Sequence, residues 1–244
     1  MNLKGKTVLV TGAAKRVGRE IALCFARAGA HVLVHYRSSK KEAERLVEEI
    51  RSLKVKCYLF QADLSKISEI KRMTAAIRKK IGTVDILVNS ASLFYRTKFE
   101  ATTERDWDDF VAIHLKAPFF LAQFLAPAMK KKGGGRIINI ADWSGLRPYR
   151  DYLPYCVSKG GVITMTQALA KTLAPEVLVT AVCPGPVFPP PDLTQREKED
   201  VARKTLVGHW GKPEDVARMV VFLAESDFIT GSYHLVDGGE ILRG

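Results

Sequence analysis

The sequence predicts one α/β domain in which a parallel sheet is covered by helices on both faces. Two observations carry this prediction. Short β-branched apolar runs alternate with longer amphipathic stretches, and no repeat, low-complexity segment or linker divides the 244 residues. Parallel strands need long crossovers and are buried on both faces, so this alternation indicates a doubly wound sheet. A single domain of this class can reach about 250 residues, and residues 1–244 are therefore assigned to one domain.

Seven short apolar runs are the expected strands, and six longer stretches with helical spacing are the expected helices. The strands are expected at residues 7–11, 31–36, 55–60, 84–89, 136–141, 177–183 and 233–236. The helices are expected near residues 17–29, 39–53, 66–81, 103–131, 155–173 and 213–225. The sheet should therefore have about seven strands.

The ends of two helices carry residues that suit their positions. The glycines at 133–135 follow three lysines and end the stretch 103–131, where basic side chains complement the C-terminal helix dipole. Pro213 opens the stretch 213–225, because a first-turn position needs no N–H group, and the two acidic residues behind it suit the positive end of the dipole. These signals indicate where the two helices end and begin.

The segment from Cys183 to His209 is the one part without a clear periodic pattern. Six prolines or glycines occur between Pro184 and Pro191, and a charged helix-like piece follows. A loop of that length in a compact domain usually covers a binding site. Residues 184–209 are therefore expected to form a substrate-binding loop or lid.

The composition is typical of a soluble globular protein. Hydrophobic residues make up 47% of the chain and charged residues 26%, far from the composition of disordered chains. No run approaches the roughly 18 consecutive apolar residues of a membrane span. Lys and Arg outnumber Asp and Glu by 38 to 26, and this net charge of +12 is compatible with nucleic acid, a membrane surface, an anionic cofactor or a solvated basic surface.

The N-terminus and the cysteines indicate a cytoplasmic protein without a metal centre. The chain runs from Met1 directly into an apolar strand pattern, without the features of a secretory signal. Its four cysteines show no Cys-x-x-Cys pair and no cluster with histidine at metal-ligand spacing. They are expected to be small buried hydrophobic residues, and no metal site is expected.

A glycine-containing turn between the first expected strand and helix is the first candidate site. It reads Thr11-Gly12-Ala13-Ala14-Lys15-Arg16-Val17-Gly18. Such a turn lets backbone N–H groups and a helix N-terminus approach a pyrophosphate closely. Its match to a Gly-x-Gly-x-x-Gly pattern is poor, so the strand, turn and helix context carries the prediction of dinucleotide binding.

The end of the second expected strand indicates which dinucleotide binds. The chain there reads His35-Tyr36-Arg37-Ser38. An acidic residue would hold the 2′-hydroxyl of NAD, whereas an arginine accommodates the 2′-phosphate of NADP, and residues 31–41 include no acidic residue. Lys15 and Arg16 add positive charge beside the same pocket. The sequence therefore predicts NADPH as the cofactor, with residues 36–38 near its 2′-phosphate.

Tyr155 and Lys159 are candidate catalytic residues. They lie four residues apart on an expected helix and therefore share one face. A lysine ammonium beside a phenol favours the phenolate and lowers the pKa of the tyrosine, which makes it a usable proton donor and acceptor near neutral pH. The spacing alone is common, so further motifs are needed.

Further motifs make the chain resemble the short-chain dehydrogenase/reductase family from end to end. They are Asn89-Ser90-Ala91 after the fourth expected strand, Cys183-Pro184-Gly185-Pro186 after the sixth, and Val236-Asp237-Gly238-Gly239 at the seventh. The resemblance implies a single Rossmann-type domain with about seven parallel strands, oxidoreductase activity on a small molecule, and assembly as a homotetramer.

The resemblance also implies roles for individual residues. Tyr155 would protonate the substrate while the nicotinamide delivers hydride, and Lys159 would also hold the nicotinamide ribose. Together with Lys15, Arg16 and residues 36–38, the implied coenzyme contacts are Thr11, Gly12, Val17, Gly18, Asp63, Leu64, Asn89, Ser90, Ala91, Pro184, Gly185 and Val187.

Asp142 departs from the family's pattern. It lies thirteen residues before Tyr155, where the family has a serine that hydrogen-bonds the substrate carbonyl. An ionised carboxylate cannot donate that bond, and it repels a developing alkoxide. Either Asp142 is protonated, or the substrate offers N–H donors instead of a plain ketone. A shifted serine, Ser144, and a purely structural Asp142 are the alternatives.

Two further departures are similar to the pteridine reductase branch of the family. Arg16 stands where the family usually has glycine, and a turn with Ser92 and Phe94 replaces Asn-Ala-Gly. The branch has an arginine near the phosphates and pterin, a serine and a phenylalanine lining the site, and an aspartate that acts with the tyrosine. The resemblance implies that Arg16, Ser92, Phe94, Asp142 and Tyr155 bind substrate, with Phe94 stacked on a planar heterocycle. Ordinary packing is the alternative for Phe94.

His114 fits neither branch. It occupies the position of the family's asparagine, whose backbone carbonyl helps hold a water beside the active lysine. A backbone role is compatible with a changed side chain, although the substitution puts the proton relay in doubt. His209, beside Trp210, is left out of the site because a lone histidine is more often structural.

The sequence therefore predicts an NADPH-dependent reductase of a pterin-like substrate, with Asp142 and Tyr155 in proton donation and Lys159 assisting. One alternative is a 3-oxoacyl-acyl-carrier-protein reductase or a general carbonyl reductase, for which a basic surface would dock an acidic carrier. Another is a nucleotide-sensing regulator without turnover, against which the intact Tyr155 and Lys159 argue. No nucleic-acid or membrane partner is expected, because the cations of residues 66–80 follow an exposed helix without a binding motif.

Overall fold

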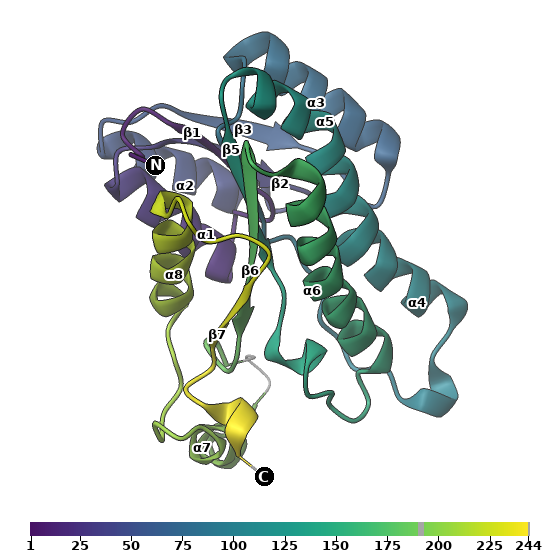
Figure 1. The fold of residues 1–244 in the computed structure, drawn as a ribbon. Helices are drawn as coiled ribbons and strands as arrows, with labels where there is room; N and C mark the ends of the chain where they lie inside the picture. Colours follow the sequence, from purple (N-terminus) through teal and green to yellow (C-terminus); the bar gives the residue numbers. More distant parts are fainter. Residues whose placement is uncertain (190–192, 244) are drawn as a thin grey trace.

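A computed structural model describes residues 1–189 and 193–243 and shows a seven-stranded sheet between two layers of helices (Figure 1). The strands are β1 (Thr7–Val10), β2 (His31–Tyr36), β3 (Cys57–Gln61), β4 (Ile86–Asn89), β5 (Gly135–Ile140), β6 (Val177–Pro184) and β7 (Tyr233–Val236). They pair in the order β3-β2-β1-β4-β5-β6-β7, and every pairing is parallel. The predicted doubly wound sheet of about seven strands is confirmed.

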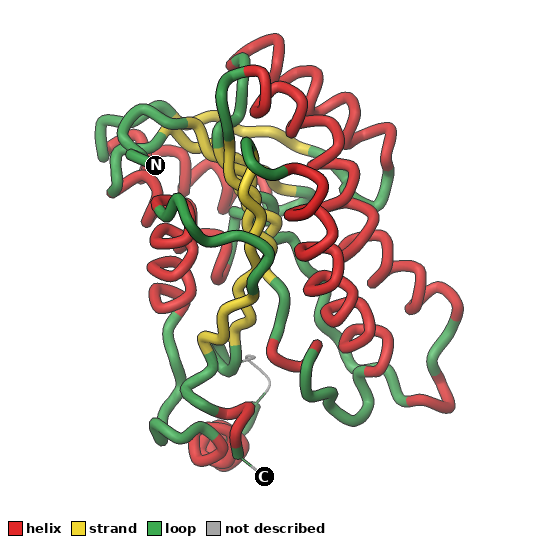
Figure 2. Tube along the Cα trace, in the orientation of Figure 1, coloured by secondary structure: helices red, strands yellow, loops and turns green. Residues whose placement is uncertain are grey.

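The helices cover both faces of this sheet, as Figures 1 and 2 show. They are α1 (Arg16–Arg27), α2 (Lys40–Ser52), α3 (Ile67–Ile81), α4 (Glu104–Val111), α5 (Ala117–Lys131), α6 (Leu153–Leu173), α7 (Gln195–Lys204) and α8 (Pro213–Glu225). On one face Phe25 of α1 and Val220 of α8 are buried against the sheet. On the other, Ile70 of α3 and Leu121 of α5 are buried. A hydrophobic core therefore lies on each side of the sheet.

The predicted helix at 103–131 consists of three consecutive helical segments. α4 is followed by a π-helical turn (Ala112–Lys116) and then by α5. A capping box begins α4, in which the Thr103 hydroxyl accepts a hydrogen bond from the Asp106 N–H and the Asp106 carboxylate accepts one from the Thr103 N–H. The π-helical turn contains His114, which is buried and lies beside the site described below.

The stretch Glu104–Lys131 is long and apolar enough to cross a membrane by length and composition alone, with a mean hydropathy of 1.4 in its apolar window. The sequence analysis predicted no membrane span, because no run of consecutive apolar residues is long enough. Half of the window is buried, and Leu121, Leu125 and Met129 of α5 belong to the core. Core packing therefore accounts for the apolar character of this stretch.

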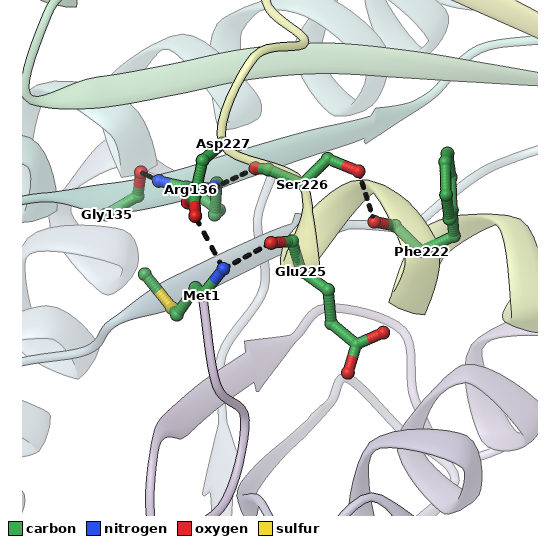
Figure 3. A network of polar contacts seen from close by, with 7 residues as sticks. All are labelled: Met1, Gly135, Arg136, Phe222, Glu225, Ser226 and Asp227. Carbon is green, nitrogen blue, oxygen red and sulfur yellow. Dashed lines mark hydrogen bonds and ion pairs between the residues drawn. The ribbon is translucent and has the colours of Figure 1, made fainter.

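A polar network ties the amino end of the sheet together, as Figure 3 shows. The Met1 ammonium and the Arg136 guanidinium, at the start of β5, both pair with Asp227 behind α8. Arg136 Nε also donates to the carbonyl oxygen of Ser226 at 3.1 Å. These contacts join the N-terminus, β5 and the end of α8 at the edge of the sheet opposite the strand ends that carry the candidate site.

The segment predicted as a lid, 184–209, is partly helical. Its residues 190–192 lie outside the described residues. A second capping box, made by Thr194 and Glu197, begins α7. The Leu206 N–H donates to the Gly238 carbonyl at 2.8 Å, so the described part of this segment lies against the turn that follows β7.

Candidate active site

A cavity of about 820 Å³ lies at the carboxyl ends of the central strands. The sheet order reverses between β1 and β4, and a doubly wound sheet binds ligands in the crevice that this reversal leaves. The sequence-predicted residues that line the cavity are Gly12, Lys15, Arg16, Val17, Gly18, Arg37, Leu64, Ser90, Ala91, Ser92, Phe94, Asp142, Tyr155, Lys159, Pro184, Gly185 and Val187. The structure brings these positions together, although they come from seven separate segments of the chain.

Two of the predicted coenzyme residues lie behind the wall of the cavity. The Thr11 hydroxyl accepts hydrogen bonds from the N–H groups of Ser90 at 2.9 Å and Ala91 at 3.0 Å. The Asn89 amide donates to Asn139 Oδ1 at 2.8 Å. Thr11 therefore holds the backbone of the lining turn after β4, and Asn89 ties the end of β4 to β5.

Tyr36, Ser38 and Asp63 also lie off the cavity lining. Tyr36 is buried in the core on the α1 face, and Ser38 is exposed beyond the end of β2. The Asp63 carboxylate accepts hydrogen bonds from the N–H and the hydroxyl of Ser65, at 3.0 and 2.7 Å. The bonds to Ser65 show that Asp63 shapes the turn after β3. The coenzyme contacts of Tyr36, Ser38 and Asp63 stay predictions.

The glycines of the turn after β1 leave space that no side chain could share. A Cβ on Gly18 would lie 2.5 Å from the Gly12 carbonyl oxygen, and a Cβ on Gly12 would lie 2.8 Å from Ala91 Cα. Gly12 also has φ +65°, which favours glycine. Lys15, the N-cap of α1, makes no side-chain hydrogen bond to the helix among the described residues. The first-turn N–H groups of α1 are therefore available to an anion.

His35, which the sequence did not single out as a site residue, supports this turn from the sheet side. The Gly12 N–H donates to His35 Nδ1 at 3.0 Å, and His35 Nε2 lies 3.1 Å from the Ala62 carbonyl oxygen. Only a neutral ring with its proton on Nε2 makes both bonds. Burial lowers the pKa of His35 to about 4, which keeps that form at neutral pH.

Three cations lie around the predicted phosphate sites. Arg37 is exposed at the end of β2, and the Lys15 ammonium pairs with Glu42 at 2.8 Å. The Arg16 guanidinium lies 4.7 Å from the ring centroid of Phe188 and donates to the Phe188 carbonyl at 3.4 Å. Arg16 therefore bridges the cavity from the glycine turn to the segment after β6.

Asp142, Tyr155 and Lys159 meet between the end of β5 and the first turns of α6. The Tyr155 hydroxyl donates to Asp142 Oδ2 at 2.8 Å. The Lys159 ammonium donates to the Ile140 carbonyl at 2.9 Å and lies 5.6 Å from the Tyr155 ring centroid. The i, i+4 spacing thus places both side chains of α6 on the face that looks toward β5.

Burial shifts the protonation of all three groups. Desolvation raises the pKa of Asp142, and desolvation together with the Asp142 charge raises the pKa of Tyr155 well above its usual value. Desolvation lowers the pKa of Lys159 to about 8. The sequence predicted that Lys159 would lower the pKa of Tyr155. That direction is wrong in this structure, because burial and the charge of the nearby Asp142 carboxyl raise the pKa of Tyr155.

Ser144 does not take the place of the missing serine. Its hydroxyl is buried and has no hydrogen-bond partner among the described residues, and the residue is absent from the described cavity lining. Its backbone N–H donates to Asp142 Oδ1 at 2.8 Å. One oxygen of Asp142 is therefore held by the backbone, and the other is bonded to the hydroxyl of Tyr155.

His114 joins the turn after β4 to α6. The Leu93 N–H donates to His114 Nε2 at 3.1 Å, so Nε2 is the unprotonated nitrogen. His114 Nδ1 lies 2.7 Å from the Ser158 hydroxyl, which donates to the Tyr155 carbonyl at 2.7 Å. Burial lowers the pKa of His114 well below its usual value. The neutral ring positions Tyr155 from behind, a role that the sequence did not reveal.

Aromatic rings form one wall of the cavity. Phe94 is 48% exposed and stacks on Tyr152, with ring centroids 4.9 Å apart and planes 8° apart. It also meets Tyr155 edge to face, at a centroid distance of 5.0 Å. Phe94 thus lies directly beside Tyr155 and is open to the cavity.

Sequence reasoning missed several lining residues, of which the main ones are Tyr149, Tyr152, Phe188, Trp210 and Glu240. Tyr149 and Tyr152 lie just before Tyr155, and that proximity was a usable signal. Trp210 Nε1 donates to the Lys198 carbonyl of α7 at 2.8 Å. No sequence pattern indicated that Glu240 lines the cavity, because only the complete fold brings the turn after β7 to it.

Known proteins match the chain along its length. The family model described as short chain dehydrogenase matches residues 6–201. The 3-oxoacyl-[acyl-carrier-protein] reductase FabG of Thermotoga maritima is 34% identical over 247 residues, which cover 99% of this chain and 100% of that protein. FabG of Staphylococcus epidermidis is 35% identical over 241 residues, which cover 96% of this chain and 98% of that protein.

Solved structures match the fold equally well. FolM alternative dihydrofolate reductase 1 from Brucella canis, complexed with NADP, has a TM-score of 0.92 and 30% identity over 99% of this chain and 96% of that one. A blue fluorescent protein from a metagenomic library, in complex with NADPH, has a TM-score of 0.90 and 32% identity over 98% of this chain and 99% of that one. The fold, the Tyr155 and Lys159 pair and these matches show that the chain belongs to the short-chain dehydrogenase family of oxidoreductases.

Proposed function

We propose that this protein is an NADPH-dependent reductase of a pterin-like small molecule, with a dihydropteridine or dihydrofolate-type ring. The hydrogen bond from Tyr155 to Asp142, 2.8 Å long, carries the proposal. A plain ketone needs hydroxyl donors around its oxygen, whereas a carboxyl group suits a heterocycle that presents N–H groups and takes up a proton on nitrogen.

The coenzyme is NADPH. The turn around Gly12 and Gly18 admits no Cβ and so suits a pyrophosphate that approaches the backbone closely. Arg37 stands at the end of β2, where an acidic residue would select NAD. Similar proteins were crystallised with NADP or NADPH. When bound, NADPH supplies the hydride.

Asp142 and Tyr155 hold the proton that the product requires. The raised pKa of Tyr155 keeps its hydroxyl protonated at neutral pH, and the raised pKa of Asp142 favours uptake of a second proton. The pair can therefore donate one proton to a ring nitrogen of the substrate. Lys159, with a pKa of about 8, is a cation at neutral pH and stabilises the negative charge that the pair then carries.

The remaining predicted substrate residues surround the space in front of this pair. Phe94 offers an exposed ring for stacking beside Tyr155. The Ser92 hydroxyl lies 2.9 Å from His114 Nε2, and Arg16 also lines the cavity, beside Phe188. A planar heterocycle with polar edges suits such a site better than a flexible acyl chain does.

A 3-oxoacyl-acyl-carrier-protein reductase or a general carbonyl reductase is the second candidate. The curated relatives named FabG favour it, at 34% and 35% identity. The net charge of +12 would also suit an acidic carrier protein. Asp142 argues against it, because its carboxyl group accepts the Tyr155 hydrogen bond and can donate to a ketone oxygen only when it is itself protonated, whereas the family's serine donates at any pH.

The substitution Asp142→Ser separates the two candidates. We expect it to lower dihydropteridine reduction by about a hundredfold, the scale of general acid–base catalysis. Ser144→Ala is the matched control, since its hydroxyl lies outside the described cavity lining, and both activities should persist. If Asp142→Ser improves ketone reduction and leaves pterin reduction intact, the proposal is wrong.

The proposal extends to four further expectations from the sequence, of which the tetramer is implied by the family resemblance. These are a homotetramer, a cytoplasmic location, a single domain over residues 1–244, and closure of the segment 184–209 over the substrate. Light scattering of the purified protein tests the tetramer. Protection of the segment from hydrogen exchange by NADPH and substrate tests its closure.

A further inference from the structure

Glu240 is a carboxyl group in the cavity that the proposed function does not use. It begins the 3₁₀ turn Glu240–Leu242 behind β7. Its side chain lines the same cavity as Asp142 and Tyr155, although the residue is only 8% exposed. The small exposed part of this residue therefore faces the space where a substrate would lie.

Glu240 lacks the partners that a buried carboxylate usually has. Among the described residues, none donates a hydrogen bond to it or forms an ion pair with it. Asp237, three residues earlier, differs in this respect, because its oxygens accept the N–H groups of Gly239 and Ile241, both at 3.0 Å. Burial of a carboxyl group without donors is costly. Asp237 shapes the turn, whereas Glu240 is free to meet a ligand.

The turn that carries Glu240 is anchored on both sides. The Arg147 guanidinium donates to the carbonyl of Ile241 at 3.3 Å and to that of Arg243. The Arg243 guanidinium donates to the Thr205 carbonyl at 2.9 Å. The guanidinium of Arg147 thus donates to backbone oxygens of this turn, and these bonds fix the turn that carries Glu240.

Burial is the largest influence on the pKa of Glu240, and it raises the pKa against the opposing effect of two nearby cations. Lys204 and Arg147 lower its pKa, Asp237 and Asp142 raise it, and desolvation leaves the pKa at about 6. Lys204 is an exposed residue of α7. At neutral pH Glu240 is therefore an anion that its surroundings leave only partly balanced.

Tyr149 relates Glu240 to the reacting groups. Burial raises the pKa of Tyr149, and the charges of Asp142 and Glu240 add to that shift. Tyr149 lines the same cavity as both carboxyl groups. The ring of Tyr149 also packs against Tyr152 at a centroid distance of 5.9 Å, next to Phe94. A substrate that fills this cavity in front of Tyr155 would therefore meet Tyr149 and Glu240 as well.

We infer that Glu240 selects substrates whose substituent beyond the reacting ring carries hydroxyl or amino donors and no negative charge. The inference rests on the proposed function. A hydroxylated side chain supplies the donor that Glu240 lacks, and an anionic tail brings like charges together in a poorly solvated space. Glu240 is a specificity residue, with no part in the proton transfer.

Three dihydropterins with the same reacting ring test the inference. One carries a neutral polyhydroxyalkyl substituent, one a methyl group, and the third, dihydrofolate, an anionic glutamate tail. Glu240→Gln keeps the shape and removes the charge. We compare kcat/KM for the polyhydroxyalkyl substrate with kcat/KM for dihydrofolate. We expect Glu240→Gln to lower this ratio on the order of tenfold, the scale of one hydrogen bond to a charged group. The change should arise mainly from KM. The methyl substrate should be unaffected.

Glu225→Gln is the matched control, because Glu225 is exposed at the end of α8, near the network in Figure 3. It should leave all three substrates unchanged. In the unmodified protein the ratio should rise with pH through about 6, as Glu240 ionises, and Glu240→Gln should flatten that rise. Titration of Asp142 and Tyr155 cancels in the ratio, since the reacting ring is shared.

The outcomes separate the two claims. If the protein reduces pterins but Glu240→Gln leaves the kcat/KM ratio unchanged, the role of Glu240 is wrong and the proposed function stands. An unmodified protein that reduces none of the three pterins overturns the proposed function and this inference with it.

Discussion

The side chain of Asp142 changes the surroundings of Tyr155. A serine at this position could receive the tyrosine's hydrogen bond and pass its own proton to a substrate oxygen. Asp142 receives the bond at 2.8 Å and can donate only when it is itself protonated. Burial raises its pKa and so favours that protonated form. The chemistry of the site therefore depends on how one proton is shared between two side chains.

His114 should matter for both stability and activity. His114→Ala removes the acceptor of the Leu93 N–H and the partner of the Ser158 hydroxyl. Loss of such buried bonds costs about 1–3 kcal/mol each, and Tyr155 loses its support. We expect a lower free energy of unfolding in urea together with a lower kcat. Thr164→Ala, on the exposed side of α6, is the control. A variant with unchanged kcat would show that His114 does not position Tyr155.

His35 should make the fold sensitive to acid. Its pKa is about 4 in the folded chain, below the usual 6.5, so the unfolded chain takes up a proton that the folded chain excludes. Stability is therefore complete above pH 6.5 and is lost as the pH falls toward 4, by about 3 kcal/mol for this group. Burial also lowers the pKa of His114, so this residue likewise makes the folded chain less stable as the pH falls.

Urea unfolding at a series of pH values measures this effect. His35→Gln cannot titrate, so the variant should lose less stability than the unmodified protein between pH 6.5 and 4. If the free energy of unfolding falls equally with pH in the two proteins over that range, the role assigned to His35 is contradicted.

At the scale of elements, the junction of β1 and α1 depends on close backbone approach. Gly18→Ala places a Cβ 2.5 Å from the Gly12 carbonyl oxygen, and overpacking of this kind costs about 1–3 kcal/mol. If the strain displaces the turn, the affinity for NADPH falls about ten- to a hundredfold. Isothermal titration calorimetry with NADPH measures this affinity.

Gly161→Ala is the control for this substitution. Its added Cβ meets only the end of the Leu115 side chain, at 3.0 Å, which can move aside. We expect nearly unchanged affinity for NADPH in this variant. Equal effects of the two substitutions would mean that the turn at Gly18 has no special part in coenzyme binding.

The elements also show what a sequence can and cannot reveal. The strands were predictable because each is a short buried apolar run between turns. That Tyr155 and Lys159 share a face was predictable from their helical spacing, and the pairing of Asp142 with Tyr155 from the family resemblance. The break in the helix at His114, the burial of Tyr36 and the position of Glu240 were not. Each depends on contacts between residues that are distant in sequence, such as His114 with Leu93 and Ser158.

At the scale of the whole molecule, the net charge of +12 acquires a partial explanation. Arg16, Lys15 and Arg37 line the cavity and face the predicted phosphates of NADPH, while many other cations pair with acidic residues on exposed helix faces, as Lys66 does with Glu69. Such exposed pairs contribute little stability. A coenzyme that binds only the folded chain contributes more, about 2.7 kcal/mol at a hundred times its Kd.

Thermal unfolding with each coenzyme tests this view. NADPH should raise the Tm of the unmodified protein more than an equal concentration of NADH does. Arg37→Glu removes the cation from the predicted 2′-phosphate site and should weaken NADPH binding on the order of a hundredfold, so that the preference disappears. Arg72→Glu, on the exposed face of α3, should leave the preference intact. A preference that survives Arg37→Glu would place the 2′-phosphate elsewhere.

A parallel assay of the unmodified protein tests the central claim most directly. Dihydropteridines and a 3-oxoacyl thioester are each supplied with NADPH and with NADH, and kcat/KM is measured for every pair. The Asp142 and Tyr155 pair predicts the highest value for a dihydropteridine with NADPH. A higher value for the thioester with NADPH would contradict the pterin assignment and favour the carbonyl reductase.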